Sequence, residues 1–360
     1  FQGYEEKNIV DADLYVIGNA ISKENNLLRE ILKLEKKIIS GPEWLYENIL
    51  SNKKVIAVSG THGKTTVTSM IAHALVNNNF DPNFLIAGIP KKLKKSWNIS
   101  NDEVFVIEAD EYDTCYFDKR PKFFHYRPNI LLINNIEFDH ADIYENIEMI
   151  EKNFFELIKT MQTNSKVLIN EKKVSKDFKN KLKREKLKTA LRFLSLNASN
   201  IHEENKLLAA YAIEDLISKE KVLSDLDDYT GVKRRFETIF DDKNFRLIDD
   251  FAHHPTAIEE TIKMTREQTD NLTLIVELGS NSMKRGVHDK SLVNIFKNQK
   301  TFTINASAEQ GKIFSEHAKE LSKDDIAKIC LKDKEKKTIL MCGNRNFQGF
   351  QKLILNELIK

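Results

Sequence analysis

The chain has 360 residues, of which 41% are hydrophobic and 31% charged, so it is long enough for about two or three folded domains and is not disordered. Lysine and arginine total 56 and aspartate and glutamate 54, and this net charge of +2 excludes a general attraction to nucleic acid or anionic membrane. No apolar run approaches the roughly 20 residues of a membrane-spanning helix. The cysteines Cys115, Cys330 and Cys342 are far apart and fit the reduced thiols of a cytoplasmic protein.

Residues 1–52 are predicted to form an incomplete, Rossmann-like N-terminal domain. A strand, a helix, a second strand and a turn are expected at Leu14–Ile17, Asn26–Leu34, Lys37–Ile39 and Ser40–Pro42. The chain opens at Phe1–Tyr4 without a methionine. We therefore expect the natural protein to begin further upstream.

Residues 53–235 are predicted to form a central domain. Its expected strands are Val55–Val58, Val104–Ile107 and Ile130–Ile133, and its expected helices are Thr65–Val76 and Glu145–Met161. The near-continuous apolar character of the strands is typical of a parallel sheet that is covered on both faces. The basic stretches Lys91–Ser96 and Lys172–Lys188 are interpreted as solvated loops or helix faces.

Residues 236–360 are predicted to form a C-terminal domain that is again Rossmann-like. Its expected strands are Leu247–Ile248, Leu272–Val276, Phe302–Ile304 and Ile339–Met341, and a helix is expected at Thr256–Arg266. The predicted fold is therefore α/β, with three domains built around parallel sheets.

A phosphate-binding loop lies between the first central strand, which ends at Ser59, and the helix that follows it. The loop reads Gly60-Thr61-His62-Gly63-Lys64-Thr65-Thr66. Glycines allow backbone N–H groups to approach phosphate oxygens, and the helix N-terminus adds positive partial charge. Lys64 can reach the β- and γ-phosphates of ATP, and the Thr65 hydroxyl can bind Mg²⁺. The loop is tighter than the usual pattern, because Val58 stands where the first glycine is expected.

Two clusters of acidic residues follow strands of the predicted central sheet. Glu108–Asp113 comes directly after Ile107, and Asn134–His140 comes directly after Ile133. Ligands of parallel sheets bind beyond the carboxyl ends of the strands, so both clusters should meet the phosphate loop. Either cluster alone is equally well explained as a solvated acidic loop, but the three together favour a magnesium–ATP site.

The phosphate loop and the segments Glu108–Asp113 and Asn135–His140 resemble the Mur ligases, which build the peptide of bacterial cell-wall precursors. The resemblance implies a three-domain ligase that uses ATP and Mg²⁺. It further implies that Lys64 contacts the γ-phosphate and that the metal is held by Thr65, Glu108 and His140.

Longer stretches resemble one branch of this family, namely Phe105–Asp113, Phe117–Arg120, His125–Tyr126 and Asn135–Asp142. That branch joins UDP-N-acetylmuramate to the murein tripeptide L-alanyl-γ-D-glutamyl-meso-diaminopimelate in cell-wall recycling. Three alternatives remain open: a ligase that adds L-alanine to the same sugar nucleotide, a P-loop NTPase without ligase activity, and an inactive ligase.

Later motifs extend the resemblance. Gly231–Glu237 is similar to the family's interdomain hinge, which implies that Arg235 reaches the ATP phosphates; a surface ion pair is the alternative. The segment Asp249–Thr256 implies that Asp250 approaches the nucleotide and that His253 serves the incoming amine, although a helix-capping loop would explain part of it. Asn205 is the best match for the family's adenine-binding asparagine. The alternative is that this segment is only an ordinary helix start.

Two departures from the family pattern bear on the substrates. Ser280–Lys284 fits the tripeptide branch, but Leu278 and Gly279 replace an expected Pro-Arg pair. Recognition of the peptide carboxylates is therefore open, with Lys284 and Arg285 as candidate substitutes for the arginine. The family's N-terminal glycine-rich turn is absent, which leaves Gly18–Ala20 and Ser40–Pro42 as candidates for contacting UDP.

Overall fold

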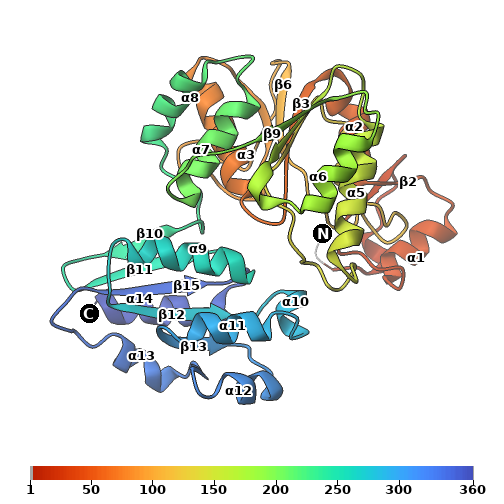
Figure 1. Cartoon of the computed structure of the whole chain (residues 1–360). Coiled ribbons are helices and arrows are strands. Elements are labelled where there is room, and N and C mark those ends of the chain that lie inside the picture. Colours follow the sequence, from red (N-terminus) through yellow and green to blue (C-terminus); the bar gives the residue numbers. More distant parts are fainter. Residues whose placement is uncertain (1–2, 360) are drawn as a thin grey trace.

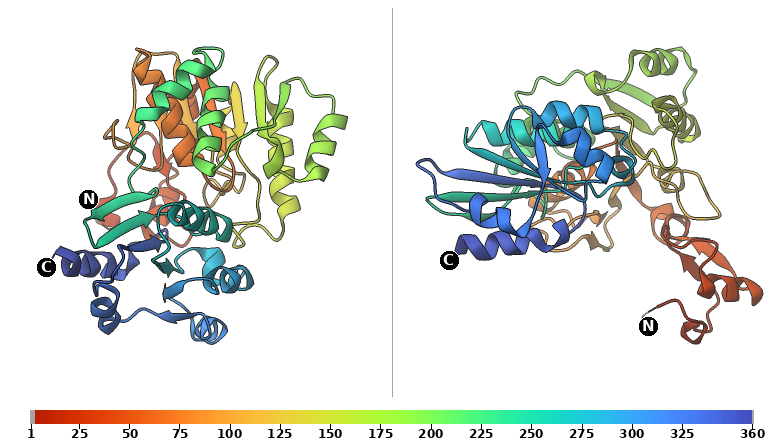
Figure 2. Two further views of the ribbon diagram at one scale, coloured as in Figure 1. Left: turned by 60° about the vertical axis from the view of Figure 1, so that its left-hand side comes forward. Right: turned by 90° about the horizontal axis from the view of Figure 1, so that it is seen from below.

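The computed structural model describes residues 3–359, so Phe1, Gln2 and Lys360 lie outside the described part of the chain. Three β-sheets follow one another along the sequence, and helices cover them. The predicted α/β class is confirmed by this arrangement. In Figure 1 the C-terminal portion lies below the central one, and the N-terminal portion lies to the right. Figure 2 shows the N-terminal portion projecting away from the other two.

The N-terminal sheet has two parallel strands, β1 (Tyr15–Ile17) and β2 (Ile38–Ser40), which are connected through α1 (Asn26–Lys33). The turn predicted at Ser40–Pro42 is wrong, because helix α2 (Gly41–Asn48) begins there. The Ser40 hydroxyl accepts a hydrogen bond from the Glu43 N–H at 3.2 Å and so caps this helix. Proline is compatible with the first helical turn, where its missing N–H has no intrahelical partner.

The central sheet has seven strands in the order β5-β4-β6-β3-β7-β8-β9, and all its pairs are parallel except β4–β5. The strands are β3 (Lys54–Ser59), β4 (Asn83–Leu85), β5 (Trp97–Asn98), β6 (Val104–Glu108), β7 (Ile130–Ile133), β8 (Lys166–Asn170) and β9 (Ala190–Leu194). The predicted strands are β3, β6 and β7, which lie side by side at its centre. Their carboxyl ends therefore meet at one edge, as the sequence analysis required.

Helices cover both faces of the central sheet, and they are α3 (Lys64–Asn77), α4 (Phe123–Tyr126), α5 (Ile147–Thr160), α6 (Lys176–Arg184), α7 (Ile201–Ala212) and α8 (Lys219–Asp225). On one face, α3, α7 and α8 pack against Ile56 and Val58 of β3. On the other face, α2, α4, α5 and α6 pack against Val55 and Ala57. Alternate β3 residues thus enter different cores, which explains why the strand is apolar from Val55 to Val58.

The C-terminal sheet has six strands in the order β10-β11-β15-β12-β13-β14, and only β10 is antiparallel to its neighbour. The strands are β10 (Glu237–Asp241), β11 (Phe245–Asp250), β12 (Leu272–Glu277), β13 (Lys300–Ile304), β14 (Ala318–Glu320) and β15 (Lys337–Cys342). The helices are α9 (Pro255–Arg266), α10 (Asn281–Lys284), α11 (Asp289–Phe296), α12 (Ala308–Phe314), α13 (Lys323–Ile329) and α14 (Phe350–Ile359). They form separate cores on the two faces.

Within residues 3–359, none of the helices is both long enough and apolar enough to cross a membrane. The domain limits at residues 52/53 and 235/236 stay predictions.

Candidate active site

The phosphate loop takes a conformation that only glycine adopts readily at two positions. Gly60 has φ +131° and Gly63 has φ +82°. A Cβ atom at Gly60 would lie 2.8 Å from the Asn135 backbone oxygen. The Asn135 side chain accepts a hydrogen bond from the His62 N–H at 3.0 Å. The segment after β7 therefore holds the loop between β3 and α3 in place.

Lys64, the first residue of α3, lies among carboxylates at the mouth of the loop. Its ammonium group donates to the Gly60 carbonyl at 2.7 Å and to Glu111 at 3.0 Å, and Asp110 is 3.4 Å away. Burial by itself would lower the pKa of Lys64, but Glu111 and Asp110 raise it above its usual value. The side chain is therefore a fixed positive charge, which suits an interaction with phosphate.

Thr65, Glu108 and Arg235 form a second contact group beside the loop. The Thr65 hydroxyl donates to Glu108 at 3.1 Å, and Arg235 donates to the same hydroxyl at 2.8 Å. The other Glu108 oxygen accepts from the Ala87 N–H at 2.7 Å. Burial raises the pKa of Glu108, although Arg235 opposes this shift. Two of the predicted metal ligands, Thr65 and Glu108, therefore lie beside Arg235, the arginine that is predicted to bind phosphate.

His140 belongs to a neighbouring group of possible metal ligands with Asp110 and Glu111, whose ligand atoms lie within 4.8 Å of one another. The Glu111 Oε1 atom is buried and has no hydrogen-bond partner within the part of the chain that the structure describes. Glu108 is not a member of this group. Carboxylate, hydroxyl and imidazole donors are present in these two groups, and their chemistry suits a hard cation such as Mg²⁺.

A cavity of about 500 Å³ joins these groups to the C-terminal sheet. Its lining includes Lys64, Glu108, His140, Arg235 and His253. The His253 Nδ1–H donates to the Phe251 carbonyl at 2.9 Å, which leaves Nε2 as the unprotonated ring nitrogen. Burial lowers the pKa of His253 to about 4, so its ring is neutral near pH 7.

An adjoining cavity of about 270 Å³ holds other predicted nucleotide contacts, among them Gly63, Thr66, Asn205 and Asp250. Asn205 is buried within α7, and its Oδ1 atom has no hydrogen-bond partner among the described residues. The helix start is instead capped by Asn200, whose side chain accepts from the Glu203 N–H at 3.0 Å. Asn205 therefore has no capping role, and its side chain lines this cavity.

Asp250 and the paired arginines organise the connection between the central and C-terminal sheets. The Asp250 carboxylate accepts from the Phe236 N–H at 2.5 Å and from the Ala252 N–H at 2.7 Å. Arg234 pairs with Asp249 at 3.1 Å, whereas Arg235 turns toward Thr65. The motif thus forms an ion pair through Arg234, but with a buried carboxylate and not at the surface.

Gly279, which replaces an expected arginine, is enclosed by the segment after β15. A Cβ atom there would lie 2.6 Å from Cγ of Arg345 and 2.8 Å from Oδ1 of Asn344. Of the two candidate substitutes, Arg285 donates to the Ala141 carbonyl at 2.9 Å, and the Lys284 side chain is exposed. The cation nearest to Gly279 is therefore Arg345, which sequence reasoning did not consider.

The two segments proposed to contact UDP line a third cavity, of about 340 Å³, together with central residues that include Leu85 and Lys122. Gly18 and Asn19 enter from one side and Gly41 and Pro42 from the other. Asn19 donates to the Asp113 carbonyl at 2.6 Å, which joins the N-terminal segment to the acidic cluster after β6.

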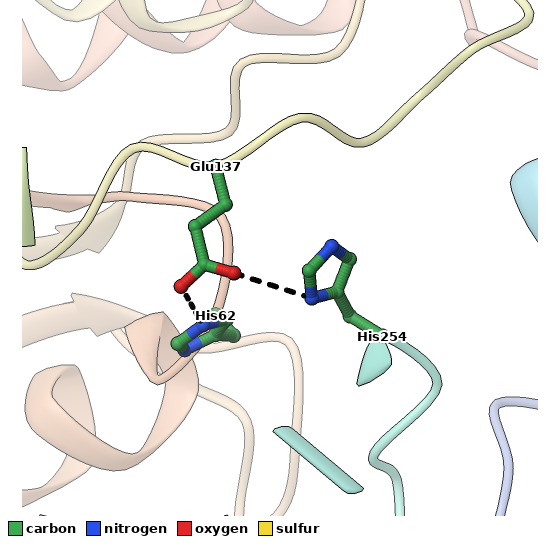
Figure 3. A group of neighbouring side chains, drawn as sticks. All are labelled: His62, Glu137 and His254. Carbon is green, nitrogen blue, oxygen red and sulfur yellow. Dashed lines mark hydrogen bonds and ion pairs between the residues drawn. The ribbon is translucent and has the colours of Figure 1, made fainter. Parts of the chain in front are cut away.

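Sequence reasoning overlooked Glu137, which connects the phosphate loop with the C-terminal portion (Figure 3). Its carboxylate lies 2.9 Å from Nε2 of His62 and 3.4 Å from Nδ1 of His254. It also overlooked the contact of Asp139 with Ser282, at 2.7 Å. The acidic cluster after β7 was a signal for both carboxylates, but His254 and Ser282 belong to the C-terminal portion, far away in the sequence.

Comparisons with known proteins identify the relatives of this chain. Residues 58–211 match a family model described as the Mur ligase middle domain, and residues 234–345 match one described as the Mur ligase, glutamate ligase domain. The UDP-N-acetylmuramate–L-alanyl-gamma-D-glutamyl-meso-2,6-diaminoheptandioate ligase of Haemophilus influenzae is 34% identical over 310 residues, covering 77% of this chain and 68% of that protein.

A UDP-N-acetylmuramate–L-alanine ligase of Caldicellulosiruptor bescii is 29% identical over 307 residues, covering 76% of this chain and 66% of that protein. Among solved structures, a murein peptide ligase of Psychrobacter arcticus 273-4 superposes with a TM-score of 0.70 at 28% identity, covering 96% of this chain and 86% of that one.

Proposed function

The chain belongs to the Mur ligase family, and we propose that it is an ATP-dependent ligase that joins UDP-N-acetylmuramate to L-alanyl-γ-D-glutamyl-meso-diaminopimelate. The observation that carries the ligase reaction is one cavity, lined by Lys64, Glu108 and His253, at the strand ends of the central sheet. The choice of acid and amine rests on the relative that is 34% identical, whose name states both. We propose a cytoplasmic location, because the proposed reaction consumes ATP.

In the first step, an oxygen of the muramyl carboxylate attacks the γ-phosphorus of ATP, and the bond to the β-phosphate oxygen breaks. The products are an acyl phosphate and ADP. Lys64 and Arg235 are placed to stabilise the negative charge of the transferring phosphoryl group. Mg²⁺ bound by Thr65, Glu108 and His140 would neutralise further phosphate charge.

In the second step, the α-amine of the peptide attacks the acyl carbon, an amide bond forms, and inorganic phosphate leaves. The amine must be neutral when it attacks. The unprotonated Nε2 of His253 is a suitable acceptor for the proton that the amine then loses. Asn205 and Asp250 would hold the nucleotide in the adjoining cavity.

The deciding experiment measures phosphate release from ATP in the presence of UDP-N-acetylmuramate, with the tripeptide, with L-alanine, or with no acceptor. We expect release that depends on the tripeptide and is matched by amide product. Equal release without any acceptor would exclude a ligase and favour a P-loop NTPase. Turnover with L-alanine alone would reassign the amine, and no turnover with either acceptor would indicate an inactive ligase.

A substitution in the phosphate loop tests the same proposal. Lys64→Ala removes the ammonium group that contacts the Gly60 carbonyl and the carboxylates of Glu111 and Asp110. We expect the variant to fold and to lose at least about a hundredfold in turnover, because a preorganised charge at the transferring phosphoryl group is lost. Full activity in this variant would refute the assignment of the loop.

A further inference from the structure

The Glu137 carboxylate receives two hydrogen bonds from opposite sides of the boundary between the central and C-terminal portions. His62 of the phosphate loop donates from Nε2 to Oε1 at 2.9 Å. Thr256, in the first turn of α9, donates its hydroxyl to Oε2 at 2.5 Å. Figure 3 shows the carboxylate lying between the two rings of His62 and His254. Glu137 therefore ties the loop to the beginning of α9.

His62, Glu137 and His254 form a group that could bind a metal ion, and the hydrogen bonds around His62 show whether its ring can be a ligand. The Asn135 Oδ1 atom accepts from the His62 N–H, so the Asn135 amide nitrogen faces Nδ1 of His62 at 3.1 Å and donates to it. Nδ1 of His62 is then an acceptor, and Nε2 must carry the proton. A protonated Nε2 cannot bind a metal, so the group of His62, Glu137 and His254 is best explained as a hydrogen-bonded tie.

His254 contributes to the tie by its position rather than by a hydrogen bond to Glu137. Its Nε2–H donates to the Phe138 carbonyl at 3.2 Å, next to Glu137 in the chain. Nδ1 is consequently unprotonated, and it is buried without a hydrogen-bond partner in the described structure. The hydroxyl of Thr256 therefore carries the contact between the carboxylate and α9.

The hydrogen bond between Glu137 and Thr256 lies close in the chain to the proposed base His253. Residues 253–256 run from the proposed base, His253, to the threonine that Glu137 holds. The first two residues of this segment, His253 and His254, line the cavity that Lys64 also lines. Holding Thr256 against the loop therefore restrains the position of the His253 ring in the wall of this cavity.

We propose that Glu137 is a positioning residue, which fixes the C-terminal loop over the phosphate loop so that the acyl phosphate is passed to the amine and not to water. The inference rests on the proposed ligase function. An open site would let water attack the acyl phosphate, so ATP would be consumed without amide formation. The measurable sign of the role is the ratio of phosphate released to amide formed.

The test is Glu137→Ala in the full chain, assayed with ATP, UDP-N-acetylmuramate and the tripeptide. We expect turnover to amide to fall by about 10- to 100-fold, as misplacement of a reacting group does. The phosphate-to-amide ratio should rise above one. Thr256→Val should raise the ratio in the same direction, and Glu137→Gln should restore part of the coupling, because its amide oxygen still accepts one hydrogen bond.

Glu259→Ala is the matched control. This exposed glutamate lies on α9, as Thr256 does, and its loss should leave the phosphate-to-amide ratio at one. Lower turnover of Glu137→Ala with an unchanged ratio would indicate general structural damage and overturn the inference. Tight binding of Zn²⁺ by the wild type, abolished in Glu137→Ala, would overturn it in favour of a metal site.

A second readout does not depend on amide formation. Hydrogen exchange of backbone amides in the first turn of α9, measured with ADP present, should be faster in Glu137→Ala than in the wild type. If the wild type forms no amide, the proposed function fails, and this measurement still reports whether the tie exists. Unchanged exchange together with coupled turnover would refute the positioning role alone.

Discussion

The Arg235 guanidinium donates a hydrogen bond to the Thr65 hydroxyl, with 2.8 Å between Nη2 and Oγ1. This contact brings the hinge cation to the start of α3, where phosphate groups are expected. Its neighbour Arg234 instead binds Asp249, whose side chain is buried. The two adjacent arginines thus have different expected roles: Arg235 binds the nucleotide phosphates, and Arg234 stabilises the fold.

Substitution of the two arginines should therefore have different effects. Arg235→Ala is expected to lower kcat by about 100- to 1000-fold, because it removes charge stabilisation at the phosphates. Arg234→Ala should lose about 1–3 kcal/mol of stability, since a buried carboxylate is left unpaired. Kinetics and urea unfolding on both variants check this. Equal kinetic losses in both would contradict the division of roles.

The sequence predicted most securely the elements with a local signal. The strands β3, β6 and β7 are apolar along their interiors because both of their faces are buried. Helix α2 was missed, since Pro42 was interpreted as a turn residue although it lies within the first helical turn. Strand β9 was missed because it lies at the sheet edge and is largely accessible to solvent.

The same distinction applies to the site. Lys64, Glu108 and His140 follow strands, so the parallel topology alone predicts that they converge. The pairing of Glu137 with Thr256 spans 119 residues and joins two different sheets, and no local pattern marks it. The division of the acidic cluster, with Glu108 bound to Thr65 and Glu111 facing His140, depends on side-chain directions that the sequence does not specify.

The two glycines Gly60 and Gly311 should respond in opposite ways to alanine. At Gly60, φ is +131° and a Cβ atom would lie 2.8 Å from a backbone oxygen, so Gly60→Ala should cost about 1–3 kcal/mol of stability and abolish nucleotide binding. Gly311 lies within α12 with open space around it, so Gly311→Ala should add about 0.5–1 kcal/mol. Thermal unfolding and ADP titration test both. Retained ADP binding in Gly60→Ala would refute the assigned loop geometry.

Glu108 is expected to determine the magnesium requirement. Glu108→Gln removes the charge but keeps an oxygen that can accept from the Ala87 N–H, so the local fold should persist. We expect the Mg²⁺ concentration for half-maximal phosphate release to rise by at least about 10-fold. Glu103→Gln, at the exposed amino end of the same strand region, is the control. An unchanged magnesium requirement would remove Glu108 from the ligand set, and EDTA should stop the wild type.

His288 should make the protein less stable in acid. Its ring packs edge-on against His254 with 4.8 Å between centroids, and its Nε2 atom is buried without a partner among the described residues. Burial lowers the pKa of His288 to about 4 in the folded state, against an ordinary value of 6.5. The unfolded chain therefore binds a proton between these two values that the folded chain does not, so stability is present above pH 6.5 and is lost toward pH 4.

The variant His288→Phe keeps a ring in this place and removes the titration. Between pH 7 and pH 5, the wild type should lose about 2 kcal/mol more unfolding free energy than the variant, a figure that follows from the size of the pKa shift. Urea unfolding at both pH values measures the difference, and comparing slopes cancels any constant effect of the larger ring. Between pH 7 and pH 8 the change in unfolding free energy should differ between the two by only about 0.1 kcal/mol, because His288 is mostly neutral in both the folded and the unfolded state there. Parallel curves from pH 7 down to pH 5 would show that a proton reaches His288 in the folded protein, and so that its site is open to water.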